Sequence, residues 1–259
     1  KTLSLVRDRM GEKPLYYGWQ GNVLLFGSEL KSLRHYPKWQ PEINNDAIAS
    51  LVKYGYIPCP QTIYSDFYKL PPGHIFTTKC GVASREHTIK PWWSLTNVVG
   101  HDTDMGCGSN SSDVLATLDN LFNEIIQQHK IADVPLGALL SGGIDSTFVL
   151  AYLQKNSSQP ISTFTIGYSE SEYDESEYAR KVANYFGTKH HEWIVTPEDA
   201  RNVIPDIPMH YDEPFADSSQ IPTILVSRMA SKDVTVALSG DGGDESFGGY
   251  NRYTWGGSI

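Results

Sequence analysis

Two near-identical glycine loops, each directly after a short apolar run, constrain the fold of this chain most. "VPLGALL" leads into Ser141-Gly142-Gly143, and "VTVALSG" ends in Ser239-Gly240 and continues as Asp241-Gly242-Gly243. Apolar runs typical of strands alternate with helical spacing: strands at 134–140, 161–168, 190–196 and 234–240, helices at 111–130, 146–155, 174–187 and 221–230. This alternation predicts an α/β fold, a parallel sheet with helices on both faces. Ligands bind beyond the carboxyl ends of such strands, where both loops would lie.

The first loop has the features of a phosphate cradle. Its glycines allow positive φ and close approach of amide groups, and a helix starting near Ser146 would point its positive end at the loop. Ser141, Ser146 and Thr147 would add hydroxyl donors. The commonest phosphate loop needs a lysine, and Asp145 takes its place here. A carboxylate facing phosphates needs a cation between them, so Asp145 predicts Mg²⁺.

The second loop carries three acids: Asp241, Asp244 and Glu245. If the two preceding strands are neighbours, Asp145 and Asp244 could hold one or two Mg²⁺ ions from opposite sides. The simpler interpretation is a tight turn with an exposed aspartate, since glycine-rich turns are common. Two such loops at strand ends of one sheet favour the ligand site.

The first third of the chain has strand patterns of another kind. We expect a hairpin over 13–29 turning at Gln20-Gly21-Asn22, and a further strand at 3–8. A short helix should begin near 44, capped by Asn45 or Asp46. Residues 57–78 should form an extended loop, a Pro-Pro-Gly turn and a strand. The polar, glycine-rich stretch 94–112 is interpreted as a linker, dividing the chain into domains 1–93 and 113–259.

Composition excludes several classes of function. The formal net charge of −9 disfavours nucleic acid as the main partner, and no apolar run is long enough to span a membrane. Cys59, Cys80 and Cys107 are odd in number without CxxC spacing, so we expect neither a disulfide framework nor a zinc site. His190 and His191 should point to opposite faces of a strand and cannot chelate together, so we favour a surface or loop role for them.

Four stretches together resemble one family. "SGGIDS" resembles the loop of the PP-loop ATP pyrophosphatases, and "LSGDGGDESFGGYNRY" resembles the second loop of the glutamine-dependent asparagine synthetases. "RDRMGEKPLYYG" with "FGSELKSL" is similar to the closing strands of that family's glutaminase (Ntn-type) domain, and "YDEPFADSSQIPT" also fits. The resemblance implies an antiparallel glutaminase portion at 1–93 and part of a synthetase domain at 113–259.

The resemblance also implies a reaction and its residues. ATP would adenylate the β-carboxylate of aspartate, and ammonia from glutamine would displace AMP to give asparagine. Asp145 and Asp244 would be Mg²⁺ ligands, and Asp241 would help handle the ammonia. Asp217, Ser218 and Ser219 would contact the amino-acid substrate. The ATP contacts would be Leu139, Ser141, Gly142, Gly143, Asp145, Ser146, Ile166, Ser239 and Gly240, with Leu139, Ile166, Ser239 and Gly240 near the adenosine.

The chain departs from the family pattern at both ends. It begins at Lys1 without the family's N-terminal nucleophilic cysteine, and it stops at Ile259, soon after the second loop. We therefore expect an internal fragment of a longer cytoplasmic enzyme, inactive by itself. The oligomeric state, for which we consider a homodimer, does not follow from the chain. The alternatives are another PP-loop amide-forming ligase (a β-lactam or peptide cyclase, or a sugar-acid amidotransferase) and a non-catalytic nucleotide-binding module.

Overall fold

The chain divides into two compact units, and one segment from the second half of the chain belongs to the first unit. The computed structural model describes residues 1–79, 81, 85–101, 110–131, 133–169, 174–251 and 253. Unit 1 comprises Lys1–Gly108 and Ile207–Asp217, and unit 2 comprises Ser109–Asp206 and Ser218–Ile259. Helix α2 (Leu95–His101) lies inside the stretch 94–112 that composition suggests as a linker, and residues 102–109 of that stretch lie outside the described residues. Cys80 and Cys107 also lie outside them, and Cys59 is a free thiol.

Unit 1 contains two three-stranded antiparallel sheets. The predicted hairpin is confirmed as β2 (Tyr16–Gln20) and β3 (Val23–Gly27), and β4 (Phe67–Lys69) pairs with β2 to give the order β3-β2-β4. The predicted strand at 3–8 is β1 (Thr2–Val6), which lies in the other sheet beside β5 (His74–Lys79), with β6 (His87–Pro91) on the far side. The short strand β4 lies in the stretch expected to be a loop.

The core of unit 1 lies on both faces of the β3-β2-β4 sheet. Leu5 from β1, Tyr17 from β2 and Phe76 from β5 pack together between the two sheets. The opposite face is covered by the short helix η1 (Leu30–His35), whose Leu30 and Leu33 pack on Phe67. Burial of such side chains contributes roughly 1.5–3 kcal/mol each.

The predicted helix near residue 44 is α1 (Asn45–Tyr54), and it ends at Gly55 as expected for a left-handed C-cap. The predicted N-cap was wrong by one residue. Asn44 is the cap, because its side-chain oxygen accepts hydrogen bonds from the amides of Asp46 and Ala47.

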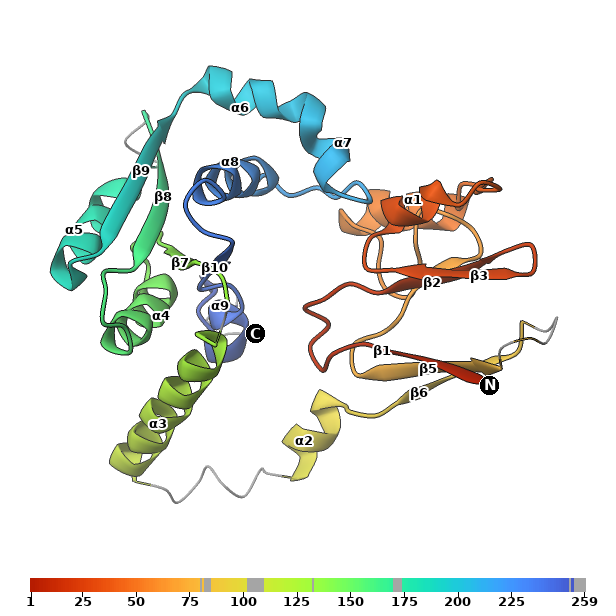
Figure 1. Ribbon diagram of the computed structural model, residues 1–259, viewed down its shortest axis with the longest axis horizontal. Coiled ribbons are helices and arrows are strands. Elements are labelled where there is room, and N and C mark those ends of the chain that lie inside the picture. The colour runs from red at the N-terminus through yellow and green to blue at the C-terminus, as the bar shows by residue number, and fades with distance from the viewer. Residues whose placement is uncertain are drawn as a thin grey trace. The chain divides into compact units, whose positions relative to one another are not determined.

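Unit 2 contains the predicted parallel sheet (Figure 1). Its strands are β7 (Leu136–Leu139), β8 (Ser162–Tyr168), β9 (Lys189–Val195) and β10 (Val236–Leu238), in the order β10-β7-β8-β9, and every neighbouring pair is parallel. Because β10 lies next to β7, the two glycine loops leave the sheet from adjacent strands. The α/β prediction is confirmed, and the condition for a joint site, that the strands before the two loops are neighbours, is met.

Helices cover both faces of this sheet. On one face, α3 (Ser111–His129), α4 (Ile144–Lys155) and α5 (Ser176–Phe186) form a core that includes Leu150, Leu153 and Ala183. On the other face, α8 (Gln220–Ala230) packs through Ala230 on Phe164 of β8. Helix α4 begins two residues before Ser146, and the N-cap of α3 is Asn110.

Four short elements of the second half had not been predicted. They are α6 (Pro197–Val203), η3 (Ile204–Asp206), α7 (Ile207–His210) and α9 (Gly243–Phe247). Helix α6 carries a readable signal, since Thr196 and Asp199 form a capping box and Pro197 follows the cap.

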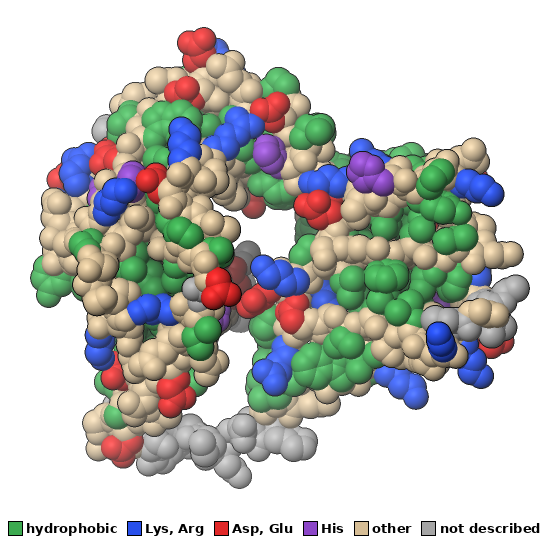
Figure 2. Space-filling model, in the orientation of Figure 1, with side chains coloured by type: hydrophobic (Ala, Val, Ile, Leu, Met, Phe, Trp, Pro, Cys, Tyr) green, Lys and Arg blue, Asp and Glu red, His purple; other side chains and the backbone are tan. Residues whose placement is uncertain are grey.

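The surface in view mixes acidic and basic side chains rather than gathering the acids in one patch (Figure 2). No helix in the described part of the chain is long and apolar enough to cross a membrane.

Candidate functional site

The first glycine loop is anchored at the carboxyl end of β7. The buried Leu140 donates its amide hydrogen to Phe164 O at 2.9 Å, and its carbonyl accepts a hydrogen bond from the Thr165 hydroxyl. Strand β8 therefore fixes the last residue before Ser141. The loop then runs through Gly142 and Gly143 into the first turn of α4.

Gly142 is the one loop residue whose conformation and surroundings both require glycine. Its φ is +84°, in the left-handed region, and a Cβ there would lie 2.6 Å from Ala179 N and 2.8 Å from the Tyr178 carbonyl carbon. The first turns of α5 thus pack directly on the loop.

The loop serines bond to one another. The hydroxyls of Ser141 and Ser146 lie 2.9 Å apart, and Ser141 Oγ accepts from the Gly143 amide at 3.2 Å. Ser146 is buried, and its hydroxyl also lies 3.3 Å from Gly143 O. These hydrogen bonds fix the backbone conformation of the loop. The neighbouring Thr147 Oγ1 is buried and has no hydrogen-bond partner among the described residues.

The second loop packs directly against the first. A Cβ at Gly240 would lie 2.6 Å from the Ser146 amide nitrogen, and one at Gly243 would lie 2.4 Å from the Asp145 carboxyl carbon. Both glycines are therefore required by close approach of the two loops. The structure brings Asp145 beside the residue that precedes Asp244, in the first turn of α9.

The acids of the second loop differ in their surroundings. Asp241 is exposed, and its carboxylate accepts a hydrogen bond from the Ser239 hydroxyl at 3.0 Å. Asp244 is half-buried, and a Cβ at Gly249 would overlap its carboxylate oxygen, so a larger residue there would force the Asp244 side chain to turn. Glu245 accepts from the Tyr250 hydroxyl at 2.7 Å, which directs it into a contact within the loop.

Asp145 and Asp244 fit the chemistry of a magnesium ion. One or two carboxylates plus phosphate oxygens form the ligand set that Mg²⁺ prefers. Within the residues that the structure describes, no group of three or more His, Cys, Asp or Glu side chains lies together as a metal site. Phosphate oxygens of a bound nucleotide would therefore have to complete the coordination.

Leu139 and Ile166 lie on one face of the sheet. Leu139 pairs with Phe164, and Ile166 lies two residues further along β8, so the three side chains share the face that α8 covers. Both side chains are half-buried, as an adenosine contact would require.

The predicted substrate residues Asp217, Ser218 and Ser219 lie where the chain passes from unit 1 to unit 2. Asp217 is the last residue of the segment that belongs to unit 1, and Ser219 is the N-cap of α8. They thus stand apart in the chain from both glycine loops.

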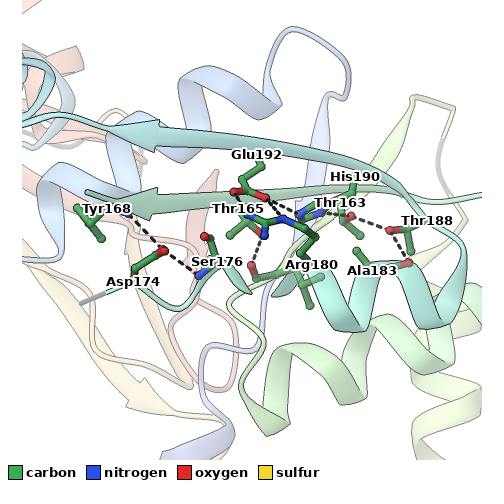
Figure 3. A network of polar contacts seen from close by, with 11 residues as sticks. Thr163, Thr165, Tyr168, Asp174, Ser176, Arg180, Ala183, Thr188, His190 and Glu192 are labelled. Atoms are coloured by element: carbon green, nitrogen blue, oxygen red, sulfur yellow. Dashed lines mark hydrogen bonds and ion pairs between the residues drawn. The ribbon is translucent and has the colours of Figure 1, made fainter. Parts of the chain in front are cut away.

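A polar network joins α5, the helix that packs on the first loop, to β9 (Figure 3). Arg180 donates two hydrogen bonds to Glu192, at 3.0 and 2.6 Å, and these bonds are the first cause that lowers the pKa of Glu192. His190 contacts the Thr163 hydroxyl at 3.0 Å, and burial lowers the pKa of its imidazole. The sequence gives little signal for this network beyond the "HHE" triplet.

The two histidines face opposite sides of β9, as predicted, and neither has the surface or loop role that we favoured. His191 stacks on Phe164, with ring centres 5.0 Å apart, on the α8 face, whereas His190 faces Arg180 and Glu192. Both are strand residues that pack against the sheet.

Asp174 closes the far end of β8 and was missed as a candidate residue. Its Oδ1 accepts hydrogen bonds from the Tyr168 and Ser176 amides, at 3.3 and 3.1 Å. The bonds from Ser176 are the first cause that lowers the pKa of Asp174. The acidic stretch before α5 was the available signal, interpreted as a solvated helix start.

Two family models match the chain over most of its length. The model described as asparagine synthase matches residues 117–257, more than half of the chain, and the model of a glutamine amidotransferase domain matches residues 1–93. The chain belongs to the asparagine synthase family. The two glycine loops of this asparagine synthase family member both lie within the first match.

Curated relatives agree with this assignment. A Methanocaldococcus jannaschii relative is 38% identical over 94% of this chain and 46% of its own length. The glutamine-hydrolysing asparagine synthetase 1 of Bacillus subtilis is 33% identical over 95% of this chain and 37% of its own length. Asparagine synthetase 3 of Arabidopsis thaliana is 34% identical over 96% of this chain and 38% of its own length. The chain thus spans less than half the length of these relatives.

Among solved structures, an ammonia-dependent NAD synthetase from Campylobacter jejuni is 12% identical, covering 52% of this chain and 60% of its own chain, with a TM-score of 0.38. A likeness at that level supports no inference.

Proposed function

We propose that this chain is part of a ligase that makes asparagine from aspartate, ATP and glutamine-derived ammonia, through a β-aspartyl-AMP intermediate. Membership of the asparagine synthase family supports the amide-forming class. The glutamine amidotransferase match over residues 1–93 supports glutamine as the nitrogen source. A cytoplasmic location and a homodimer stay predictions from the sequence.

One observation carries the proposal most directly, namely the packing of the two glycine loops. Gly240 and Gly243 approach Ser146 and Asp145 so closely that no side chain fits between the loops. The two strand ends therefore form one cradle. A cradle with backbone amides, hydroxyls and carboxylates suits a triphosphate that is cleaved between its α- and β-phosphates.

The first step transfers AMP to the acceptor. A β-carboxylate oxygen of aspartate bonds to the α-phosphorus as the bond to the β-phosphate oxygen breaks, and pyrophosphate leaves. We assign the binding of the leaving phosphates to the loop amides with Ser141, Gly142, Gly143 and Ser146. Asp145 and Asp244 would hold Mg²⁺, which neutralises phosphate charge when bound. We assign the adenosine to Leu139, Ile166, Ser239 and Gly240.

The second step forms the amide. The ammonia nitrogen bonds to the acyl carbon, the bond from that carbon to AMP breaks, and one proton is lost. We assign Asp241 to this step, because its carboxylate is exposed in the second loop of the cradle and can accept that proton. Asp217, Ser218 and Ser219 are proposed to contact aspartate.

The test measures pyrophosphate release by the protein expressed from its complete gene. ATP and Mg²⁺ are supplied with aspartate and either ammonia or glutamine, and each acceptor is omitted in turn. We expect release to depend on aspartate and Asp145→Ala to lower kcat/KM at least about a hundredfold, since a removed electrostatic contact typically costs that much. Asp113→Ala is the matched control, because Asp113 also lies in the first turn of a helix of unit 2.

Two results would contradict the proposal. Pyrophosphate release without dependence on aspartate would assign the cradle to another acceptor, such as that of a cyclase. ATP binding without turnover, with every acceptor offered, would favour a non-catalytic nucleotide-binding module.

A further inference from the structure

We propose that Asp212 and Glu213 position the residues assigned to aspartate by anchoring residues 207–217, which we call the strap. The strap belongs to unit 1 by its contacts, although the chain on either side of it belongs to unit 2. The inference rests on the proposed function, since it concerns where the residues assigned to aspartate are held. Asp212 and Glu213 are thus positioning residues, which act on the substrate only through the residues assigned to aspartate.

Asp212 anchors the strap to the start of η1. One carboxylate oxygen accepts the Leu30 amide hydrogen at 2.6 Å, and the other accepts that of Lys31 at 3.0 Å. Lys31 returns the contact, because its Nζ donates to the carbonyls of Met209 and His210 at 3.0 and 3.2 Å. The Asp212 carboxylate therefore anchors the strap and also accepts hydrogen bonds from the first two amides of η1, which have no partner within that helix.

Glu213 makes the second anchor. Its Oε1 accepts the Ile63 amide hydrogen at 2.7 Å, and its Oε2 lies 2.6 Å from Lys69 Nζ. The two side chains are only 10% and 17% exposed, so water screens this ion pair little. Lys69 also donates to Ile57 O at 2.6 Å. A buried pair with these additional hydrogen bonds keeps one geometry.

Polar contacts fix the strap on unit 1. A pocket of about 350 Å³ lies beside it, lined by strap residues 210–215 and by Pro14, Tyr16 and Tyr56 of unit 1. Burial and the negative charges of Glu213 and Asp212 raise the pKa of Tyr16. Because that side of the strap is not filled by side chains, loss of either carboxylate would let the strap shift.

The strap leads straight into the proposed acceptor residues. Ala216 donates its amide hydrogen to Gly55 O at 2.6 Å, and Asp217, Ser218 and Ser219 follow. Helix α8 then begins at Gln220 and packs on the sheet of unit 2. Asp217, the first residue of this stretch, belongs to the same unit as the strap, so a shift of the strap would move it.

The experiment uses the protein expressed from its complete gene, with ammonia as nitrogen donor so that glutamine hydrolysis is bypassed. Asp212→Asn and Glu213→Gln keep the side-chain shape and one acceptor oxygen but remove the charge. We expect each to raise KM for aspartate about tenfold, while KM for ATP stays within about twofold of wild type. Glu213→Ala, which also removes the acceptor for Ile63, should raise KM for aspartate further.

If Asp212 and Glu213 only stabilised the fold, their variants would change kcat and KM in a different way. Partial unfolding would lower kcat through the active fraction and leave both KM values unchanged. Asp199→Ala is the matched control: it removes a carboxylate that accepts a backbone amide hydrogen in the capping box of α6, outside the strap and the cradle. We expect it to leave KM for aspartate unchanged.

Hydrogen exchange supplies a readout independent of catalysis. In Asp212→Ala, the Leu30 and Lys31 amides should lose protection, and in Glu213→Ala the Ile63 amide should do so. Unchanged KM for aspartate in variants that lose this protection would overturn the proposal. Failure of the wild-type protein to use aspartate would instead contradict the proposed function, and the inference with it.

Discussion

Gly142 and Gly187 share a left-handed backbone conformation but differ in what surrounds them. Both adopt left-handed φ values, +84° and +66°. Gly187 ends α5 in open space, with nothing within 4 Å of an added Cβ, whereas an added Cβ at Gly142 would meet the backbone of Tyr178 and Ala179. The first glycine therefore fixes the cradle, and the second only ends a helix.

Alanine substitution separates the two cases. Gly187→Ala should cost about 1–2 kcal/mol of unfolding free energy, the strain of an L-residue in that region, and leave ATP affinity unchanged. Gly142→Ala adds a clash with backbone that cannot move aside, so we expect it also to lower ATP affinity at least about tenfold. Urea denaturation and ATP titration of both variants check this. Equal ATP affinity in the two variants would contradict the role of Gly142.

The network between α5 and β9 connects the helix that packs on the first loop to a titrating side chain, His190. Burial is the first cause that lowers the pKa of His190, while the nearby Glu192 carboxylate raises it. Arg180 and His191 act in the same direction as burial. A depressed histidine pKa favours the neutral ring in the folded state. Its contribution to stability is therefore present above about pH 6.5 and is lost as the pH falls through the folded pKa.

Removing the charge of Glu192 should sharpen this pH dependence. In Glu192→Gln the pKa of His190 falls further, so more stability should be lost between pH 7.5 and pH 5.5 than in the wild-type protein. Urea denaturation at the two pH values measures the difference, and Glu192 itself stays ionised throughout because its pKa is lowered. A His190→Gln background should abolish the extra loss. An unchanged pH dependence in Glu192→Gln would contradict the coupling.

Long periodic elements were predictable, and short ones stabilised by distant residues were not. The stripe of apolar residues in α5 and the glycine after it suffice to place that helix. By contrast, η1 has no cap from its own sequence, and its first amides are completed by Asp212, some 180 residues away. Strand β4 has three residues, too few for a period, and forms because β2 offers it an edge.

The same division applies to the site. The positions of Ser141, Gly142 and Asp145 between β7 and the first turn of α4 could be predicted, because an apolar run typical of a strand precedes them and helical spacing follows. The approach of Gly243 to Asp145 depends on β10 lying beside β7, which no local pattern encodes. Asp174 was missed because the Tyr168 and Ser176 amides, whose hydrogen bonds it accepts, come together only in the folded turn.

At the scale of the whole molecule, the proposed nucleotide site lies entirely within unit 2. ATP with Mg²⁺ should therefore protect amides of β7, α4 and β10 from hydrogen exchange and leave the β1-β5-β6 sheet unchanged. At about a hundred times Kd, binding should add roughly 2.7 kcal/mol to the stability of the unit that binds. Exchange measured by mass spectrometry across both units checks this, with Asp145→Ala as the non-binding control. Protection spread over both sheets of unit 1 would contradict the assignment.

The strap also has a consequence for the order in which the chain can fold. A ribosome releases the strands of unit 1 early, but Asp212 and Glu213 follow about a hundred residues later. At about 5–20 residues per second, the amides of Leu30, Lys31 and Ile63 wait several seconds or more for their acceptors. Unit 1 is therefore finished only after most of the parallel sheet has been synthesised. The boundary between the units cannot be drawn as a single cut in the sequence, because residues 207–217 belong to unit 1 and the chain on either side of them to unit 2.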